Sequence, residues 1–181
     1  RPDKDFSWEK MNEITGKIEG EMSWPLIGLV WLQKNGFEII NIEAFNYTEF
    51  IQNPQDYFKS ILGEEEAKVQ IKCFENNKEK TLESTREFIK VANIENRIPI
   101  IKDIKDFLTK EYIIIADYSI DHSIIIRGFD DENLFLNDPA FGHRLVKINL
   151  FEKIWSNHRS IFAIKNKQNL LINKEKIPDE E

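Results

Sequence analysis

Residues 121–139 (DHSIIIRGFDDENLFLNDP) predict a β-hairpin. Two short runs rich in Ile, Leu and Phe flank an Asp/Glu/Asn turn, a pattern typical of antiparallel strands joined by a short loop. Three consecutive isoleucines at 124–126 indicate that the first strand is covered on both faces rather than half exposed. We therefore expect this strand to be buried inside the fold.

The two ends of this hairpin carry polar residues. His122 opens the first strand and Asp138 ends the second, so the hairpin can bring them together although they are far apart in the sequence. A histidine oriented by a carboxylate is the base half of a nucleophilic triad. We expect a ring nitrogen of His122 to lie about 2.6–3.2 Å from a carboxylate oxygen of Asp138. In the alternative interpretation, His122 is a core-edge histidine bonded to the backbone.

The register of the hairpin decides whether this pairing can form. Side chains alternate between the two faces of a strand, so a shift of one residue moves a side chain to the other face. We expect Gly128 to pair with Leu134 around a five-residue loop, which places Ile124 opposite Asp138. His122 and Asp138 are then diagonal neighbours on one face, roughly 7–8 Å apart at the backbone. A two-residue turn would place them on opposite faces.

The segment from His122 to Asp138-Pro139 resembles the His and Asp region of the peptidase C39-like family, which are papain-like cysteine peptidases. Residues 7–17, 23–25 and 32–37 resemble the part of these proteins that follows the nucleophile. The resemblance implies peptide-bond hydrolysis by a Cys-His-Asp triad, with His122 and Asp138 as catalytic residues and a peptide or protein as substrate. The family's cysteine and its oxyanion glutamine have no counterpart here. We therefore expect the nucleophile to lie upstream of Arg1 or to be absent.

Helices are expected mainly in the first half of the chain and strands mainly in the second. Helices are predicted at 7–14, 23–35, 46–53, 54–62, 64–92 with a break near 76–77, 102–109 and 149–155, and strands at 37–42, 112–117, 122–128, 134–137, 145–148 and 159–165. This order indicates an α+β protein. With the resemblance, it implies a papain-like fold in which N-terminal helices pack on a C-terminal antiparallel β-sheet. We expect one domain over residues 1–166, lacking the nucleophile helix, and a polar tail over 167–181.

The composition narrows the choice of partners. With 25 basic and 32 acidic residues the net charge is −7, which argues against nucleic acid and anionic membranes as partners. No apolar run approaches the roughly 20 residues of a membrane span. A single cysteine excludes an internal disulfide and favours a reducing, cytoplasmic location. No cofactor is implied, and the oligomeric state does not follow from the sequence.

The single cysteine, Cys73, precedes His122 and Asp138 in the order that a triad would need. It lies inside the helix predicted over 64–92, without a helix N-terminus to activate it, so we expect a buried structural thiol. His143 and His158 lack the spacing of metal ligands and are expected at the surface. Two function classes stay open: a C39-like cysteine peptidase, or a catalytically silent papain-like module that binds peptides. An acyltransferase using the same triad is not separable from the peptidase by sequence.

Overall fold

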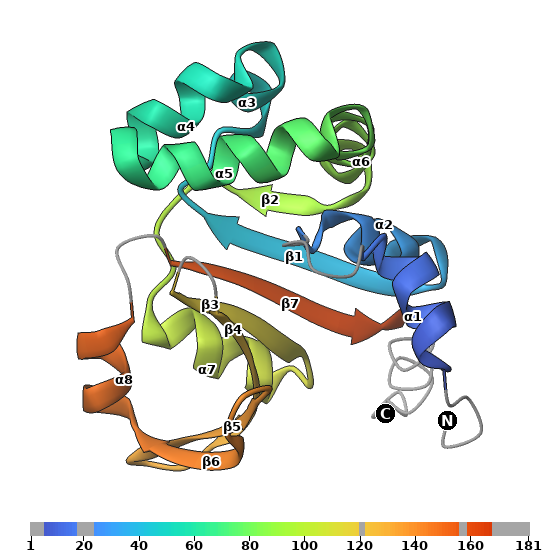
Figure 1. Cartoon of the computed structure of the whole chain (residues 1–181). Helices are drawn as coiled ribbons and strands as arrows, with labels where there is room; N and C mark the ends of the chain where they lie inside the picture. Colours follow the sequence, from blue (N-terminus) through green and yellow to red (C-terminus); the bar gives the residue numbers. More distant parts are fainter. Residues whose placement is uncertain (1–5, 18–23, 120–121, 156–158, 168–181) are drawn as a thin grey trace, which may run out of the picture. The chain divides into compact units, whose positions relative to one another are not determined.

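The computed structural model describes residues 6–17, 24–119, 122–155 and 159–167 (Figure 1). The chain divides into two compact units, which we call the helical unit (Arg1–Asn35 and Asn46–Ala92) and the sheet unit (Gly36–Phe45 and Asn93–Glu181). Each unit is formed by two separate stretches of the sequence. The predicted helix start at Ser23, the predicted tail beyond Lys167 and His158 lie outside the described residues.

Local chemistry explains where the helices of the helical unit begin and end. The described helices are α1 (Trp8–Thr15), α2 (Leu26–Lys34), α3 (Tyr47–Gln52), α4 (Pro54–Leu62), α5 (Glu64–Asn76) and α6 (Lys78–Val91). The Ser7 hydroxyl accepts a hydrogen bond from the Lys10 N–H at 3.2 Å, and Gly16 ends α1 at φ 68°. Asn46 caps α3 in the same way. The predicted break near residues 76–77 is confirmed, since Asn77 separates α5 from α6.

The core of the helical unit is a cluster of aromatic rings centred on Phe50. This fully buried side chain contacts four other rings at centroid distances of 5.3–6.2 Å: Trp24, Tyr57, Phe58 and Phe74. Trp8 and Met11 are apolar residues of α1, but they are exposed and do not face this core. Trp8 is 84% exposed, and Ile14 is the buried residue of α1.

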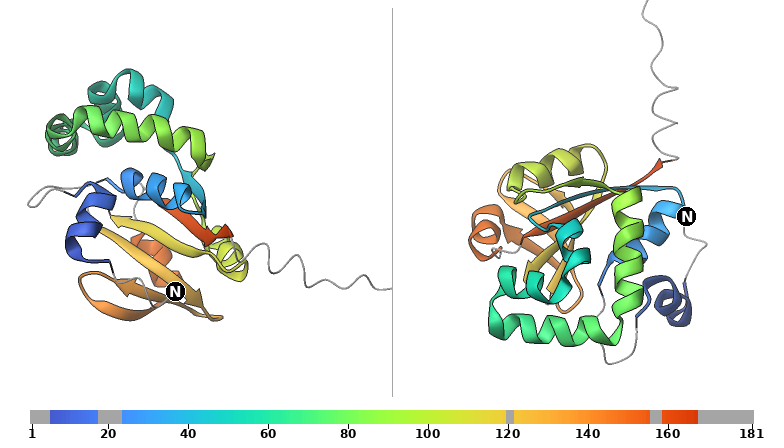
Figure 2. Two further views of the ribbon diagram at one scale, coloured as in Figure 1. Left: turned by 90° about the vertical axis from the view of Figure 1, so that its right-hand side faces the viewer. Right: turned by 90° about the horizontal axis from the view of Figure 1, so that it is seen from above.

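The described strands of the sheet unit form one seven-stranded sheet in the order β2-β1-β7-β3-β4-β5-β6, labelled in Figure 1 and drawn from two further sides in Figure 2. They are β1 (Phe37–Glu43), β2 (Asn93–Glu95), β3 (Ile113–Ser119), β4 (His122–Phe129), β5 (Asn133–Asp138), β6 (Gly142–Lys147) and β7 (Ser160–Asn166). Every pairing is antiparallel except that of β1 with β2, which the sequence did not predict. Mixed helices and strands agree with the predicted α+β class.

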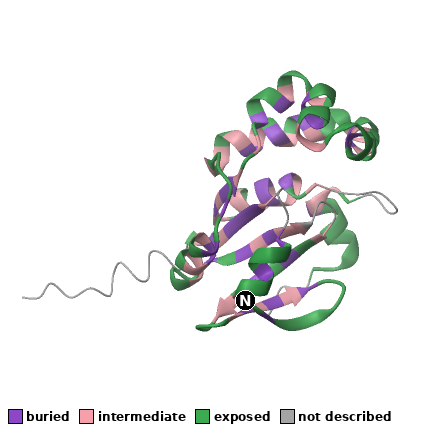
Figure 3. Cartoon of the chain, turned by 90° about the vertical axis from the view of Figure 1, so that its left-hand side faces the viewer, coloured by how far each residue is buried: buried purple, intermediate pink, exposed green. Residues whose placement is uncertain are grey.

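Two helices, α7 (Ile101–Thr109) and α8 (Ile148–Ile154), complete the sheet unit. Residues of both helices share a hydrophobic core with one face of the sheet, including Ile104, Phe151, Ile124 and Ile126. Figure 3 shows buried residues on the strands of the sheet, and along β4 buried Ile124 and Ile126 alternate with exposed residues. The prediction that the three isoleucines are covered on both faces is therefore wrong, because Ile125 is 38% exposed.

The turn between α7 and β3 contains the positive-φ residue Glu111, at φ 63°. A neighbouring side chain supports the turn: the Lys165 Nζ donates a hydrogen bond to the Lys110 carbonyl oxygen at 2.7 Å. The left-handed conformation costs a non-glycine residue about 1–2 kcal/mol.

Glu111→Gly is expected to raise the free energy of unfolding by about 0.5–1 kcal/mol, because glycine relieves this strain while losing some chain entropy in the folded state. Urea unfolding measures the difference. Lys110→Gly is the matched control, because Lys110 has a φ of −88° and gains no relief. Equal effects of the two substitutions would show that strain at Glu111 does not matter.

Candidate functional site

His122 and Asp138 form the hydrogen bond that the sequence predicts. The His122 Nε2 lies 3.1 Å from the Asp138 Oδ1. The Asp138 side chain is 4% exposed, whereas the His122 side chain is 27% exposed. When the neutral imidazole donates this hydrogen bond to Asp138, its N–H is at Nε2. The other ring nitrogen, Nδ1, is then the one that can accept a proton.

A β-bulge at Arg127 makes the two side chains share a face. At the turn Phe129 pairs with Leu134, so the predicted pairing of Gly128 with Leu134 is wrong. The register shifts by one residue between Ile126 and Gly128, which leaves Arg127 as the extra residue. Beyond this bulge Ile125 pairs with Asn137, and this places Ile124 level with Asp138 as predicted. A four-residue loop plus one bulged residue thus adds up to the same number of residues as the predicted five-residue loop. For this reason His122 and Asp138 still lie on the same face of the hairpin.

The turn after β5 fixes the Asp138 carboxylate. Its Oδ1 accepts hydrogen bonds from the backbone N–H groups of Ala140 at 2.9 Å and Phe141 at 3.3 Å, as well as facing His122. Burial raises the pKa of the Asp138 carboxyl, but the hydrogen bonds from Ala140, His122 and Phe141 outweigh burial and hold the pKa below its ordinary value of 3.8. Asp138 is therefore an ionised, fixed acceptor at neutral pH.

Tyr118 lies on the other side of His122. A second register shift, between Asp117 and Ser119, makes Tyr118 a bulged residue of β3. Its ring stands edge-on to the His122 imidazole at a centroid distance of 6.4 Å and packs on Phe151 at 5.6 Å. Burial raises the pKa of the Tyr118 phenol above its ordinary value of 10.0, Arg144 opposes this rise and Asp138 adds to it. Tyr118 consequently stays protonated at neutral pH and can donate a hydrogen bond.

Arg144 is the other basic side chain beside Asp138. Its Nη1 lies 3.6 Å from the Asp138 Oδ2, the oxygen that does not face His122. On β6 Arg144 pairs with Leu136, so it shares the face of Leu136 and Asp138. This face of the sheet therefore carries one polar residue from each of the four adjacent strands β3, β4, β5 and β6. These residues are Tyr118, His122, Asp138 and Arg144. We call these four residues the polar row.

Tyr118 and Arg144 were missed by the sequence interpretation because both lie just outside the predicted strands. The predicted strands at 112–117 and 145–148 correspond to β3, which extends to Ser119, and β6, which begins at Gly142. Counting two residues forward from the buried Ala116 and two back from the buried Val146 would have placed Tyr118 and Arg144 on the same face as these buried residues.

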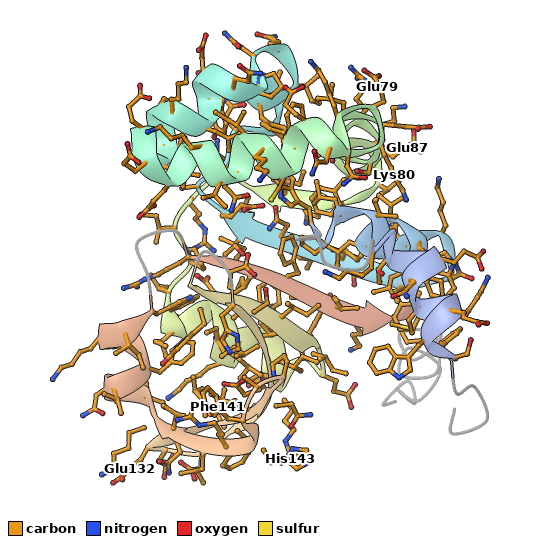
Figure 4. All side chains as sticks on the ribbon, viewed as in Figure 1. Glu79, Lys80, Glu87, Glu132, Phe141 and His143 are labelled. Carbon is orange, nitrogen blue, oxygen red and sulfur yellow. The ribbon has the colours of Figure 1, made fainter. Side chains whose placement is uncertain are left out.

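The other candidate residues lie outside the polar row. Cys73 is in the C-terminal half of α5 and is half-buried rather than fully buried. His143 is exposed, as predicted, and its Nδ1 lies 2.6 Å from the Asn137 Oδ1 (Figure 4). Among the described residues no group of His, Cys, Asp or Glu side chains could hold a metal ion. The described helices include none that is long and apolar enough to cross a membrane.

The sequence was compared with models of known protein families, and one of them matches. Residues 66–168 match the model of the peptidase C39 family, a match that covers more than half of the 181 residues and includes His122 and Asp138. The chain belongs to the peptidase C39 family. This confirms the resemblance inferred from the His and Asp-Pro segments, and C39 membership points to peptides or proteins as the class of substrate. No curated protein and no solved structure matches the chain.

In this C39-family chain, Asp138→Asn is expected to change the acid dependence of stability. Because the folded pKa of Asp138 is lowered, its charged form stabilises the fold above about pH 4, and this contribution is lost as the pH falls through the folded-state pKa. The gap in urea midpoint between wild type and Asp138→Asn should therefore narrow between pH 7 and pH 3. Asp131→Asn, in the exposed hairpin turn, is the control. A gap that is constant with pH would contradict the prediction.

Proposed function

We propose that the sheet unit carries the base and orienting groups of a papain-like cysteine peptidase. His122 accepts the proton of a cysteine thiol at Nδ1, and the resulting thiolate attacks a peptide carbonyl. The imidazolium then returns the proton to the leaving amine, and water hydrolyses the acyl-enzyme with His122 again acting as base. Asp138 keeps the imidazole in the tautomer that this cycle requires.

The observation that carries this proposal is the hydrogen bond between His122 and Asp138 on a half-exposed imidazole. The Nε2 of His122 faces a buried carboxylate that two backbone N–H groups hold in place, and this hydrogen bond sets which nitrogen carries the proton. Membership of the C39 family supports the same chemistry.

The proposal requires a cysteine thiol beside the Nδ1 of His122. Cys73, the one cysteine in the sequence, lies within the last turns of α5 and not at a helix N-terminus, where a thiolate would be stabilised. This placement is also what favours the second candidate function, a catalytically silent domain that holds a peptide. Acyl transfer to an amine instead of water would use the same groups.

Peptide cleavage by two forms of the protein tests the proposal. The 181-residue chain and the protein translated from the complete reading frame are each incubated with a mixed peptide library, with and without iodoacetamide. We expect alkylator-sensitive cleavage by the complete protein and none by the 181-residue chain. Peptide binding without cleavage by either form would favour the silent module. Alkylator-sensitive cleavage by the 181-residue chain, abolished in Cys73→Ser, would identify Cys73 as the nucleophile.

A further inference from the structure

The outermost member of the polar row has binding capacity that the proposed chemistry does not use. Asp138 occupies one edge of the Arg144 guanidinium through a single, long contact of 3.6 Å. The Arg144 side chain is 47% exposed, so a ligand can reach it from solvent. A guanidinium carries five N–H donors in a planar fork that suits bidentate pairing with a carboxylate.

Phe141 holds this guanidinium in place. The Arg144 Cζ lies 5.2 Å from the centroid of the exposed Phe141 ring, in the turn between β5 and β6 (Figure 4). Stacking on an aromatic ring lowers the entropy that an arginine loses when it forms hydrogen bonds. An arginine fixed from one side by a ring and from another by a carboxylate is preorganised for an anionic ligand.

We propose that Arg144 is a specificity-determining residue that selects an acidic residue in the bound peptide; this inference rests on the proposed function. His122 is on β4 and Arg144 on β6, two strands away in the same sheet. Both side chains contact the Asp138 carboxylate, His122 through Nε2 at 3.1 Å and Arg144 through Nη1 at 3.6 Å, so their polar ends are close together. They lie less than about 10 Å apart, which is the span of about three residues of an extended peptide at about 3.3 Å per residue. The carboxylate that Arg144 binds therefore belongs to a residue no more than about three positions from the cleaved bond.

The local charge supports an acidic ligand in spite of the net charge of −7 of the whole chain. Asp138 is the carboxylate paired with Arg144, but it is buried and accepts bonds from two backbone N–H groups and faces His122. Its charge is thus shared among several donors, while the exposed edge of Arg144 points away from it. A peptide carboxylate at that edge would gain a partly desolvated, charge-assisted pair.

A scan of glutamate positions tests this inference. N-acetylated, C-amidated Gly/Ala decapeptides carry one Glu at successive positions, and each has a Gln counterpart. Binding to the isotope-labelled 181-residue chain is followed by NMR, through the Arg144 Nε–H and His122 ring signals. We expect about five- to tenfold tighter binding of the Glu peptide than of its Gln partner at the preferred position. Arg144→Gln should abolish this preference, and Arg144→Lys should retain part of it.

Arg127→Gln is the matched control, because Arg127 is an exposed arginine outside the polar row. Equal binding of Glu and Gln peptides at every position, or a preference that survives Arg144→Gln, would overturn the inference. Cleavage by the complete protein is measured on the same peptides. Arg144-dependent binding without cleavage would keep the inference and reject the proposed peptidase activity. Cleavage that does not discriminate Glu from Gln peptides would support the proposed peptidase activity and reject the inference about Arg144.

Discussion

His122→Ala is expected to lower kcat/KM for peptide cleavage by the complete protein by about 10²–10⁴-fold, the range that a general base contributes. The substitution removes Nδ1 as the proton acceptor and leaves Asp138 with its backbone donors, so the ionised carboxylate remains hydrogen-bonded. Because the His122 side chain is half-buried at the end of a strand, we expect the fold to persist. Initial rates with a cleaved library peptide give the ratio.

His143→Ala is the control for this prediction. His143 is a histidine on β6, beside the hairpin, but it is exposed and contacts Asn137 rather than Asp138. Its substitution should leave kcat/KM unchanged. Circular dichroism must show that both variants are folded. A His122→Ala protein that keeps most of its activity would show that the base lies elsewhere.

Phe50→Ala is expected to lower the free energy of unfolding of the helical unit by about 3–5 kcal/mol. Phe50 is fully buried and contacts four aromatic rings, so the truncation leaves a cavity that helices α3, α4 and α5 cannot easily fill. Trp24 reports the change by fluorescence, because its ring lies 5.4 Å from that of Phe50. Urea unfolding followed at this signal measures the loss.

Trp8→Ala serves as the control for Phe50→Ala. Trp8 is a larger aromatic residue in the same unit, but it is mostly exposed, and its removal should change the free energy of unfolding by less than about 0.5 kcal/mol. A small effect of Phe50→Ala, comparable to that of Trp8→Ala, would mean that the ring cluster does not stabilise this unit.

The pairing of His122 with Asp138 could be predicted from sequence because it depends on strand alternation and on the parity of the hairpin. The sequence did not reveal how that parity arises, since a bulge at Arg127 depends on the neighbouring strands and has no reliable local signal. The isoleucine run was misinterpreted for a related reason. Ile125 is apolar but exposed, and apolar residues are common at protein surfaces.

Short or marginal elements were the ones missed. β2 has three residues and pairs in parallel with β1 through a connection that spans four helices, so no local pattern indicates it. Helix ends were predictable where a side chain forms the cap, as at Ser7 and Asn46. The orientation of α1 could not be predicted, because its apolar residues Trp8 and Met11 are not buried.

The pairing of β1 with β7 has a consequence for folding during translation. Ile40 pairs with Ala163, so β1 cannot join the centre of the sheet until nearly the whole described chain has been synthesised. The segments of the helical unit, by contrast, are complete at Ala92. At ribosomal speeds of about 5–20 residues per second, the nascent β1 waits on the order of 10 s with the edge that β7 covers unpaired. During this interval Ile39 and Ile42, which are fully buried in the finished structure, are open to aggregation.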